Sequence, residues 1–167
     1  MKIKGRVWIF GDDINTDLIF PHSAFRVSQE EQVKLVFSDN RPGWSGMVQK
    51  GDIIVAGRNF GTGSSRPGAV LLLRLGIGCL LADSINGLFF RNCIGYGFPA
   101  LQCTGVSGIF AEGETAAVDL LEGKVLNEQS GKTLQGNKIS RSMVETIEAG
   151  GIEELLVKRG YMDAPKS

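Results

Sequence analysis

Three short apolar runs, separated by helical segments, constrain the fold of this chain most strongly. Residues 53–56, 77–82 and 99–103 are dominated by apolar side chains and predict buried strands. Residues 70–75 and 85–93 lie between these runs and predict helices. A short alternation of strand and helix implies parallel strand pairing with the crossover helices on one side. The predicted fold class is therefore α/β.

The N-terminal third predicts two further elements. Residues 7–10 read as a short strand that ends in a Gly-Asp-Asp turn. Residues 29–37 carry apolar side chains at helical spacing. Ser28 is placed as the N-cap of this helix, and Glu31 three residues later completes a capping box.

The C-terminal third shows a different residue pattern, with shorter predicted elements. Residues 115–120 and 124–126 predict a hairpin or a second small sheet. The tail predicts two short helices, broken at Gly150-Gly151. The chain has no repeat, linker or low-complexity tract, so we expect one domain over residues 1–167, with a helical segment at about 141–160.

Composition excludes several classes of protein. The 167 residues carry 18 basic and 18 acidic side chains, and no basic run is interleaved with aromatic residues, so we expect no nucleic-acid partner. No segment approaches the roughly 18 uninterrupted apolar residues of a membrane span, so we expect no membrane partner. The N-terminus lacks the apolar region of a secretion signal, which predicts a cytoplasmic location.

The cysteines do not predict a metal site. Cys79, Cys93 and Cys103 stand in apolar surroundings and form no C-x-x-C pair. His22 is the sole histidine, and the usual ligand spacings are missing. We expect buried free thiols and no metal bound by this chain alone.

The stretch GRNFGTGSSRPGA, residues 57–69, connects a predicted strand to a predicted helix. A glycine-rich turn at a helix N-terminus presents unpaired amides and the positive end of the helix dipole, which favours an anion. The P-loop pattern fails here because Ser64, and no lysine, follows Gly63. The dinucleotide pattern fails because Arg66 stands where glycine is required. Two interpretations stay open at this point: a carboxylate site built from serines and arginine, and a tight turn with capping serines.

Several motifs together resemble one family. They are Phe10-Gly-Asp-Asp-Ile-Asn-Thr-Asp17, Gly51-Asp-Ile-Ile-Val-Ala-Gly57 with Gly61-Thr-Gly-Ser-Ser-Arg66, Phe89-Phe-Arg-Asn92 and Ile147-Glu-Ala-Gly-Gly151. In this order they resemble the free-standing swivel domain of the aconitase superfamily, the small subunit of 3-isopropylmalate dehydratase and of archaeal-type homoaconitase. The resemblance covers most of the chain.

The resemblance implies a three-layered β/β/α fold and an active site shared with a large subunit. The large subunit carries a [4Fe–4S] cluster, whose iron acts as a Lewis acid on the leaving hydroxyl of a hydroxy di- or tricarboxylate. In the matching motifs Ser64 is implied as the catalytic base. Asp17, Ser65 and Arg66 are implied as substrate-binding residues.

Two departures from the family pattern bear on the substrate. Pro67-Gly68-Ala69 replaces the usual Glu-His-Ala, so a first-turn acid and an imidazole are missing. The specificity loop corresponds to residues 24–27, where Arg26 offers a second carboxylate contact while Phe25 and Val27 offer an apolar wall. The leading expectation is 3-isopropylmalate, as in leucine biosynthesis. Homoaconitate and methylmalates or dimethylmalates are the alternatives.

Two other functions are weighed against this one. A binding module that kept the fold but lost catalysis would bind carboxylates without a cluster-bearing partner. An independent serine enzyme would need His22 as its base, and Ser64 lacks the flanking glycines of a nucleophile elbow.

Overall fold

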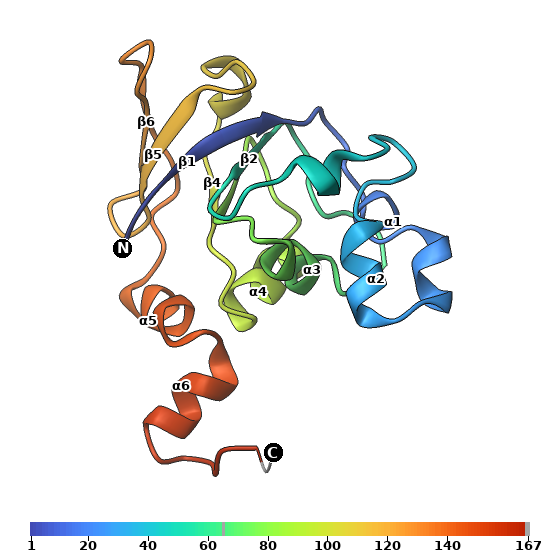
Figure 1. Cartoon of the computed structure of the whole chain (residues 1–167). Helices are drawn as coiled ribbons and strands as arrows, with labels where there is room; N and C mark the ends of the chain where they lie inside the picture. Colours follow the sequence, from blue (N-terminus) through green and yellow to red (C-terminus); the bar gives the residue numbers. More distant parts are fainter. Residues whose placement is uncertain (65, 166–167) are drawn as a thin grey trace.

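The protein is described by a computed structural model that covers residues 1–64 and 66–165. Seven strands in these residues form one mixed sheet (Figure 1). They are β1 (Lys2–Ile9), β2 (Ile53–Ala56), β3 (Cys79–Ala82), β4 (Ala100–Gln102), β5 (Thr115–Asp119), β6 (Lys124–Asn127) and β7 (Thr133–Gln135). The α-helices are α1 (Thr16–Ile19), α2 (Gln29–Lys34), α3 (Gly68–Leu75), α4 (Gly87–Gly95), α5 (Arg141–Ala149) and α6 (Ile152–Lys158). Short 3-10 helices lie at His22–Arg26, Trp44–Met47 and Val106–Gly108.

Strand β1 joins two halves of the sheet, whose strand order is β4-β3-β2-β1-β5-β6-β7. On one side it runs parallel to β2, with Val7 opposite Ile53, and β3 and β4 continue the parallel half. On its other side it runs antiparallel to β5, with Ile3 opposite Val118, and β6 and β7 continue the antiparallel half. The predicted parallel alternation is therefore confirmed for β2, β3 and β4.

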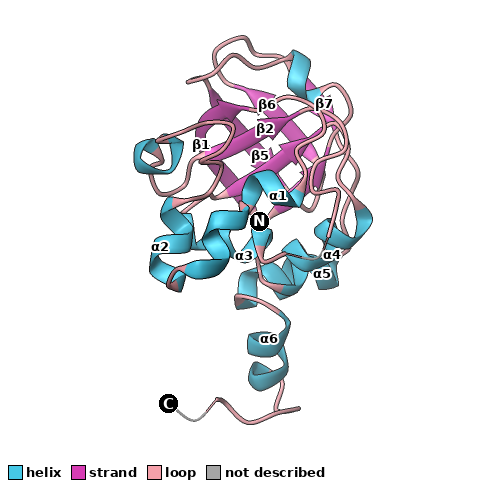
Figure 2. Cartoon of the chain, turned by 90° about the vertical axis from the view of Figure 1, so that its right-hand side faces the viewer, coloured by secondary structure: helices cyan, strands magenta, loops and turns pink. Residues whose placement is uncertain are grey.

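Alternating side chains of the parallel strands build two apolar cores. Ile54 and Leu80 belong to a cluster that also holds buried residues of α3 and α4. Ile53 and Leu81 point the other way, because side chains alternate along a strand, and belong to a cluster with Val118 of the antiparallel half. The antiparallel half, the parallel half and the helices therefore form three layers (Figure 2). This arrangement confirms the predicted α/β class with β/β/α layers.

Helix ends follow local sequence signals. The hydroxyl of Ser28 accepts the Glu31 N–H at 3.3 Å, which confirms the predicted N-cap of α2. This helix ends at Lys34, short of the predicted residue 37, and Phe37 has a left-handed backbone with φ 58°. Gly150 closes α5 with φ 96°, so the predicted break between α5 and α6 is found. Helix α6 packs against α5 and projects from the rest of the chain (Figures 1 and 2).

Three features of the strands and α-helices were not expected from the sequence. The strand predicted at residues 7–10 begins at Lys2, because the first half of β1 pairs with β5 and alternates exposed lysines with half-buried residues. Helix α1 is a single turn, capped by the side chain of Asn15. Strand β7 adds a third member to the predicted hairpin. Among the described residues there is no helix with the length and hydropathy that a membrane crossing requires.

Candidate active site

Two loops from distant parts of the sequence meet at the carboxyl ends of β1 and β2. Asn15 forms an isolated β-bridge with Thr62. The Thr16 N–H donates to the Thr62 carbonyl at 2.8 Å, and the Gly61 N–H donates to the Ile14 carbonyl at 2.7 Å. The Asn-Thr-Asp motif and the Gly-Ser-Ser-Arg motif are thereby held side by side, at the edge where ligands of α/β sheets usually bind.

Arg66 is the centre of this cluster. Its Nε lies 2.9 Å from Oδ1 of Asp17 and 3.3 Å from Oγ of Ser64. Its Nη1 donates to the Phe20 carbonyl at 2.8 Å, and its guanidinium carbon lies 5.0 Å from the ring centre of Phe25. The arginine side chain is 17% exposed, whereas that of Asp17 is 61% exposed. Ser64, Asp17 and Arg66, which the sequence predicts as site residues, are therefore brought together by the fold.

The other two predicted residues have different outcomes. Ser65 lies outside the described residues, so its predicted substrate contact stays a prediction. Arg26 is exposed at the end of the 3-10 helix His22–Arg26, next to Phe25. Among the described residues, no ion pair or hydrogen bond joins Arg26 to the cluster. The ring of His22 lies 5.7 Å from that of Phe25, and no hydrogen bond links it to Ser64 in the described part of the chain.

Left-handed backbone positions flank both motifs. Asp13 and Asn59 have φ of 58° and 62°, and the Asn59 side-chain amide donates to the Asp13 carboxylate at 2.8 Å. Residues that are not glycine adopt such angles uncommonly, and the strained conformation persists where the surroundings fix it. Arg58 adds a second link between the two loops, because its backbone N–H donates to Asp12 at 2.7 Å. That hydrogen bond is the main reason why the pKa of Asp12 lies below its usual range. The two site loops are thus tied together just before each motif.

Ser64 and Arg66 of this cluster line a very small hollow, with a volume of about 10 Å³. Ligand pockets that enclose a small molecule usually measure roughly 300–1,000 Å³. The described residues therefore form one wall of a site rather than an enclosed pocket. The lining residues are Thr16, Gly61, Gly63, Ser64, Arg66, Leu88, Phe89 and Asn92.

The replacement of an imidazole position by Gly68 has a packing explanation. A Cβ atom at Gly68 would lie 3.1 Å from Cε2 of Phe89 and 3.2 Å from Cγ2 of Ile19. Both neighbours are buried, so aromatic and aliphatic groups fill the space where a larger side chain would stand. In this chain the support for the loop at this point is apolar.

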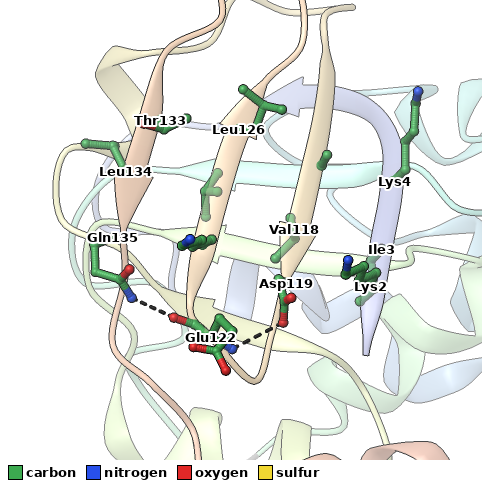
Figure 3. A pocket seen from close by; sticks show the side chains of 13 residues that line it. Lys2, Ile3, Lys4, Val118, Asp119, Glu122, Leu126, Thr133, Leu134 and Gln135 are labelled. Atoms are coloured by element: carbon green, nitrogen blue, oxygen red, sulfur yellow. Dashed lines mark hydrogen bonds between the residues drawn. The ribbon is translucent and has the colours of Figure 1, made fainter.

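A much larger hollow lies elsewhere, on the antiparallel half of the sheet (Figure 3). It measures about 680 Å³ and is bordered by β1, β5, β6 and β7. Its polar groups close the hairpin turn: the Glu122 N–H donates to Asp119, and the Gln135 amide donates to the Glu122 carbonyl. Its lining carries lysines, two acidic side chains and Thr133, but none of the motif residues Ser64, Asp17 and Arg66. The family motifs therefore favour the small hollow at Ser64 as the candidate site.

The residues that build this site match a known protein family. The model of the aconitase C-terminal domain matches residues 14–105, which include both site motifs. The 3-isopropylmalate dehydratase small subunit 1 of Methanopyrus kandleri is 41% identical over 95% of this chain and 94% of its own length. The chain belongs to the aconitase C-terminal domain family, in its small-subunit form.

Two further relatives agree with this assignment. The isopropylmalate/citramalate isomerase small subunit of Methanocaldococcus jannaschii is 41% identical over 94% of this chain and 95% of its own length. A crystal structure of 3-isopropylmalate dehydratase from the same organism superposes with a TM-score of 0.87 at 30% identity, covering 96% of both chains. The swivel-domain fold that the motifs indicate is therefore confirmed for this member of the aconitase C-terminal domain family.

Sequence reasoning assigned no role to four residues of this family member that line the hollow. Thr16 lies inside the Asn-Thr-Asp motif, and Phe89 and Asn92 lie inside a motif that also matches the family. Leu88 is the residue just before that motif. For Thr16, Phe89 and Asn92 motif membership was the available signal. Only the structure, which packs α4 against the Gly61 loop and joins Thr16 to the Ser64 carbonyl, shows that the four residues share a hollow with Ser64.

Proposed function

We propose that this chain is the small subunit of a two-subunit hydro-lyase that removes water from a hydroxy di- or tricarboxylate, with 3-isopropylmalate as the substrate that fits best. The observation that carries the proposal is the meeting of Ser64, Asp17 and Arg66 beside a hollow that Ser64 and Arg66 line and that is too small to enclose such an acid. An active site with one wall on this chain requires a second chain to supply the other. The names of the relatives, which designate small subunits, support the same conclusion.

Arg66 is proposed to bind a substrate carboxylate. Asp17 and the Phe20 carbonyl hold its guanidinium through Nε and Nη1. Its Nη2 has no hydrogen-bond acceptor among the described residues, so donors remain for an incoming anion. A planar guanidinium suits two carboxylate oxygens better than an ammonium does. Asp17 is proposed to orient Arg66, and through its exposed carboxylate to contact a substrate hydroxyl.

Ser64 is proposed as the base that takes a proton from carbon. Its Oγ lies 3.3 Å from Nε of Arg66, whose positive charge favours an alkoxide over a neutral hydroxyl. A helix N-terminus supplies about 0.3–1 kcal/mol, and at most about 2, while each pKa unit corresponds to about 1.36 kcal/mol. The helix N-terminus alone would therefore lower the pKa of the Ser64 hydroxyl by only roughly one pKa unit. Further positive groups and exclusion of water must come from the partner, so we expect the isolated chain to be inactive.

The residues of this chain do not fit the iron-sulfur cluster that the family implies. The described residues contain no group of three or more histidine, cysteine or acidic side chains that could hold a metal. Cys79, Cys93 and Cys103 are buried, and burial raises the pKa of all three thiols, that of Cys103 to about 11. We therefore place the proposed [4Fe–4S] cluster on the large subunit and assign no step on this chain to it. Free buried thiols are also in keeping with the cytoplasm as the proposed compartment.

Phe25 is the observation that favours an alkyl-substituted substrate. Its ring lies 5.0 Å from the guanidinium carbon of Arg66 and is 56% exposed, so an apolar surface stands beside the proposed carboxylate site. A branched alkyl group can contact that surface, whereas a third carboxylate would need the exposed Arg26 nearby. Homoaconitate and the methylmalates remain the second choices.

Anaerobic reconstitution tests the proposal. The purified chain is combined with the cluster-loaded large subunit of the same organism, and the formation of unsaturated acids from a panel of malates is followed by ultraviolet absorbance. We expect turnover with 3-isopropylmalate, none with either subunit alone, and a fall of about 10²–10⁴-fold in kcat for Ser64→Ala with little change in KM. Absence of turnover with every acid, together with tight carboxylate binding by the isolated chain, would favour a non-catalytic binding module instead.

A further inference from the structure

The hollow at Ser64 continues along one face of α4. Leu88, Asn92 and Tyr96 are spaced four residues apart and therefore lie on the same side of this segment. Leu88 and Asn92 line the hollow. Asn92 and Tyr96 also line a groove of about 500 Å³ that is bordered by α3, α4 and the start of α6, where Ile152 lies. Asn92 thus lines both depressions, which adjoin at this residue.

This surface exposes large apolar side chains. Leu88, Tyr96 and Ile152 are 44%, 49% and 46% exposed, and the exposed Phe25 stacks on Arg66, which lines the hollow. The described residues contain seven exposed large hydrophobic side chains, and these are four of them. A gathering of apolar side chains rimmed by polar ones is typical of a protein–protein contact.

Helix α6 forms the far end of this surface and is poorly covered. Leu155 is its only buried residue, and the views in Figures 1 and 2 show the helix projecting from the rest of the chain. A short helix that buries so little gains little from its own packing, since most helical stability in proteins comes from tertiary contact. A partner seated on α4 would bury Ile152 as well.

The basic side chains at the rim of the groove come from α3 and α4, and the acidic ones come from α6. The basic ones are Arg74 and Arg91, and the acidic ones are Glu153 and Glu154 in the first turn of α6. None of these four forms an ion pair with another described residue. A partner that fits the groove would therefore present an apolar centre, with acidic groups toward α4 and basic groups toward α6.

We propose that the face formed by Leu88, Tyr96 and Ile152, here the α4–α6 face, is where the large subunit docks. This inference rests on the proposed function, because it assumes that a large subunit closes the hollow at Ser64. A chain that closes the hollow must contact Leu88 and Asn92, which line it. Since Asn92 also borders the groove, the same contact extends over Tyr96 to α6, and catalysis and assembly use one surface.

Binding of the two subunits tests this face directly. The dissociation constant between the full chain and the cluster-loaded large subunit is measured by isothermal titration calorimetry, for the wild type, Tyr96→Glu and Ile152→Glu. We expect each substitution to raise the dissociation constant at least about tenfold, because a charge is placed at the apolar centre of a contact. Ile152 stands at the first position of α6, where an acidic residue suits the helix dipole, so folding should be unaffected.

Three controls accompany the test. Met47→Glu changes a side chain of matched exposure, 51%, that lines neither the hollow nor the groove, and should bind as the wild type does. Tyr96→Phe keeps the apolar ring and should stay within about threefold of the wild type. Circular dichroism melting checks that each variant is folded.

The outcomes separate this inference from the proposed function. If the wild type binds the large subunit and both glutamate variants bind equally well, the α4–α6 face is not the docking surface, while the proposed function stands. If the glutamate substitutions abolish self-association of this chain but leave its affinity for the large subunit unchanged, the face binds a second copy and the inference is wrong. If the wild type does not bind the large subunit at all, the proposed function fails and the inference fails with it.

Discussion

The hydroxyl of Thr16 donates a hydrogen bond to the backbone carbonyl of Ser64, with 2.7 Å between the two oxygens. Thr16 is 3% exposed, and its own N–H donates to the Thr62 carbonyl. One buried residue therefore holds the backbone on both sides of Gly63, whose φ of 104° is open to glycine far more readily than to other residues. This makes Thr16 a positioning residue for the proposed base.

Substitution of Thr16 should affect the rate more than binding. In the assembled enzyme Thr16→Val removes the hydrogen bond but keeps the shape, and we expect kcat to fall about tenfold with KM within about twofold, because small misplacements of reacting groups are costly. Thr16→Ser keeps the hydroxyl and should restore most of the rate. Steady-state kinetics on both variants is the measurement, and an equal loss in the two would indicate a packing role instead.

Arg66→Lys should weaken substrate binding although the charge is kept. A lysine cannot reproduce the planar contact with two carboxylate oxygens, and a hydrogen bond to a charged group contributes about 1.5–3 kcal/mol. We expect KM in the assembled enzyme to rise about 10–100-fold. Arg58→Lys, on the exposed arginine beside Asp12, serves as the control and should leave KM nearly unchanged. If Arg66→Lys keeps the wild-type KM, the substrate carboxylate does not bind at Arg66.

Substrate choice should divide between Phe25 and Arg26. Phe25→Leu removes the aromatic surface over Arg66 and should lower kcat/KM for 3-isopropylmalate by roughly tenfold, more than for a tricarboxylate, because apolar contacts discriminate by about 1–3 kcal/mol. Arg26→Ala should lower kcat/KM for a tricarboxylate more than for 3-isopropylmalate. The two acids are compared in competition with each variant. A uniform loss for both acids would mean that these residues only support the loop.

Gly61 is required by packing behind the site. A Cβ atom there would lie 2.2 Å from Cγ of Phe89, and its φ of 81° disfavours any other residue. We expect Gly61→Ala to lower the free energy of unfolding by about 3 kcal/mol, combining strain with a steric clash. Gly87→Ala is the matched control, because a Cβ at that helix position meets nothing within 4 Å and φ is not left-handed. Urea unfolding of the two variants decides the point, and similar midpoints would contradict the packing argument.

Asp52 should make stability depend on pH. Its carboxylate accepts hydrogen bonds from Arg6 at 2.6 Å, from the Trp8 indole at 2.7 Å and from the Gln49 N–H at 2.9 Å. Burial alone raises the pKa of Asp52, but these bonds outweigh it and the pKa lies below its usual range. The stabilisation is therefore present above the unfolded-state pKa of about 3.9 and is lost as the pH falls through the lower folded-state pKa.

Asp52→Asn tests this dependence. We expect it to lower the free energy of unfolding by about 1–3 kcal/mol at pH 7, because Arg6, the Trp8 indole and the Gln49 N–H lose a charged acceptor, and by progressively less below about pH 4. Asp39→Asn, at an exposed position, should change little at any pH. Urea midpoints measured from pH 7 down to pH 3 give the comparison. A difference between wild type and Asp52→Asn that does not vary with pH would show that shape, not charge, is what matters at Asp52.

Local signals in the sequence were sufficient for much of this fold. The apolar run 53–56 forms β2 within its predicted bounds, and Gly76 ends α3 with a φ of 99°, because these features depend on neighbouring residues only. The first half of β1 could not be predicted in this way, since its pairing partner β5 lies over a hundred residues away. Family motifs indicated Ser64, Asp17 and Arg66. The stacking of Phe25 on Arg66 arises from a short 3-10 helix that has no sequence signature of its own.

The position of β1 between the two halves of the sheet has a consequence for synthesis. It leaves the ribosome before the other six strands of the sheet, yet its parallel partner begins at Ile53 and its antiparallel partner at Thr115. One edge of β1 therefore lacks its final hydrogen bonds until β2 has been made, and the other lacks them until β5 has been made. Unpaired strand edges invite pairing with other chains. The exposed Lys2 and Lys4 on this strand carry charge that discourages such pairing while the nascent protein waits for its C-terminal half.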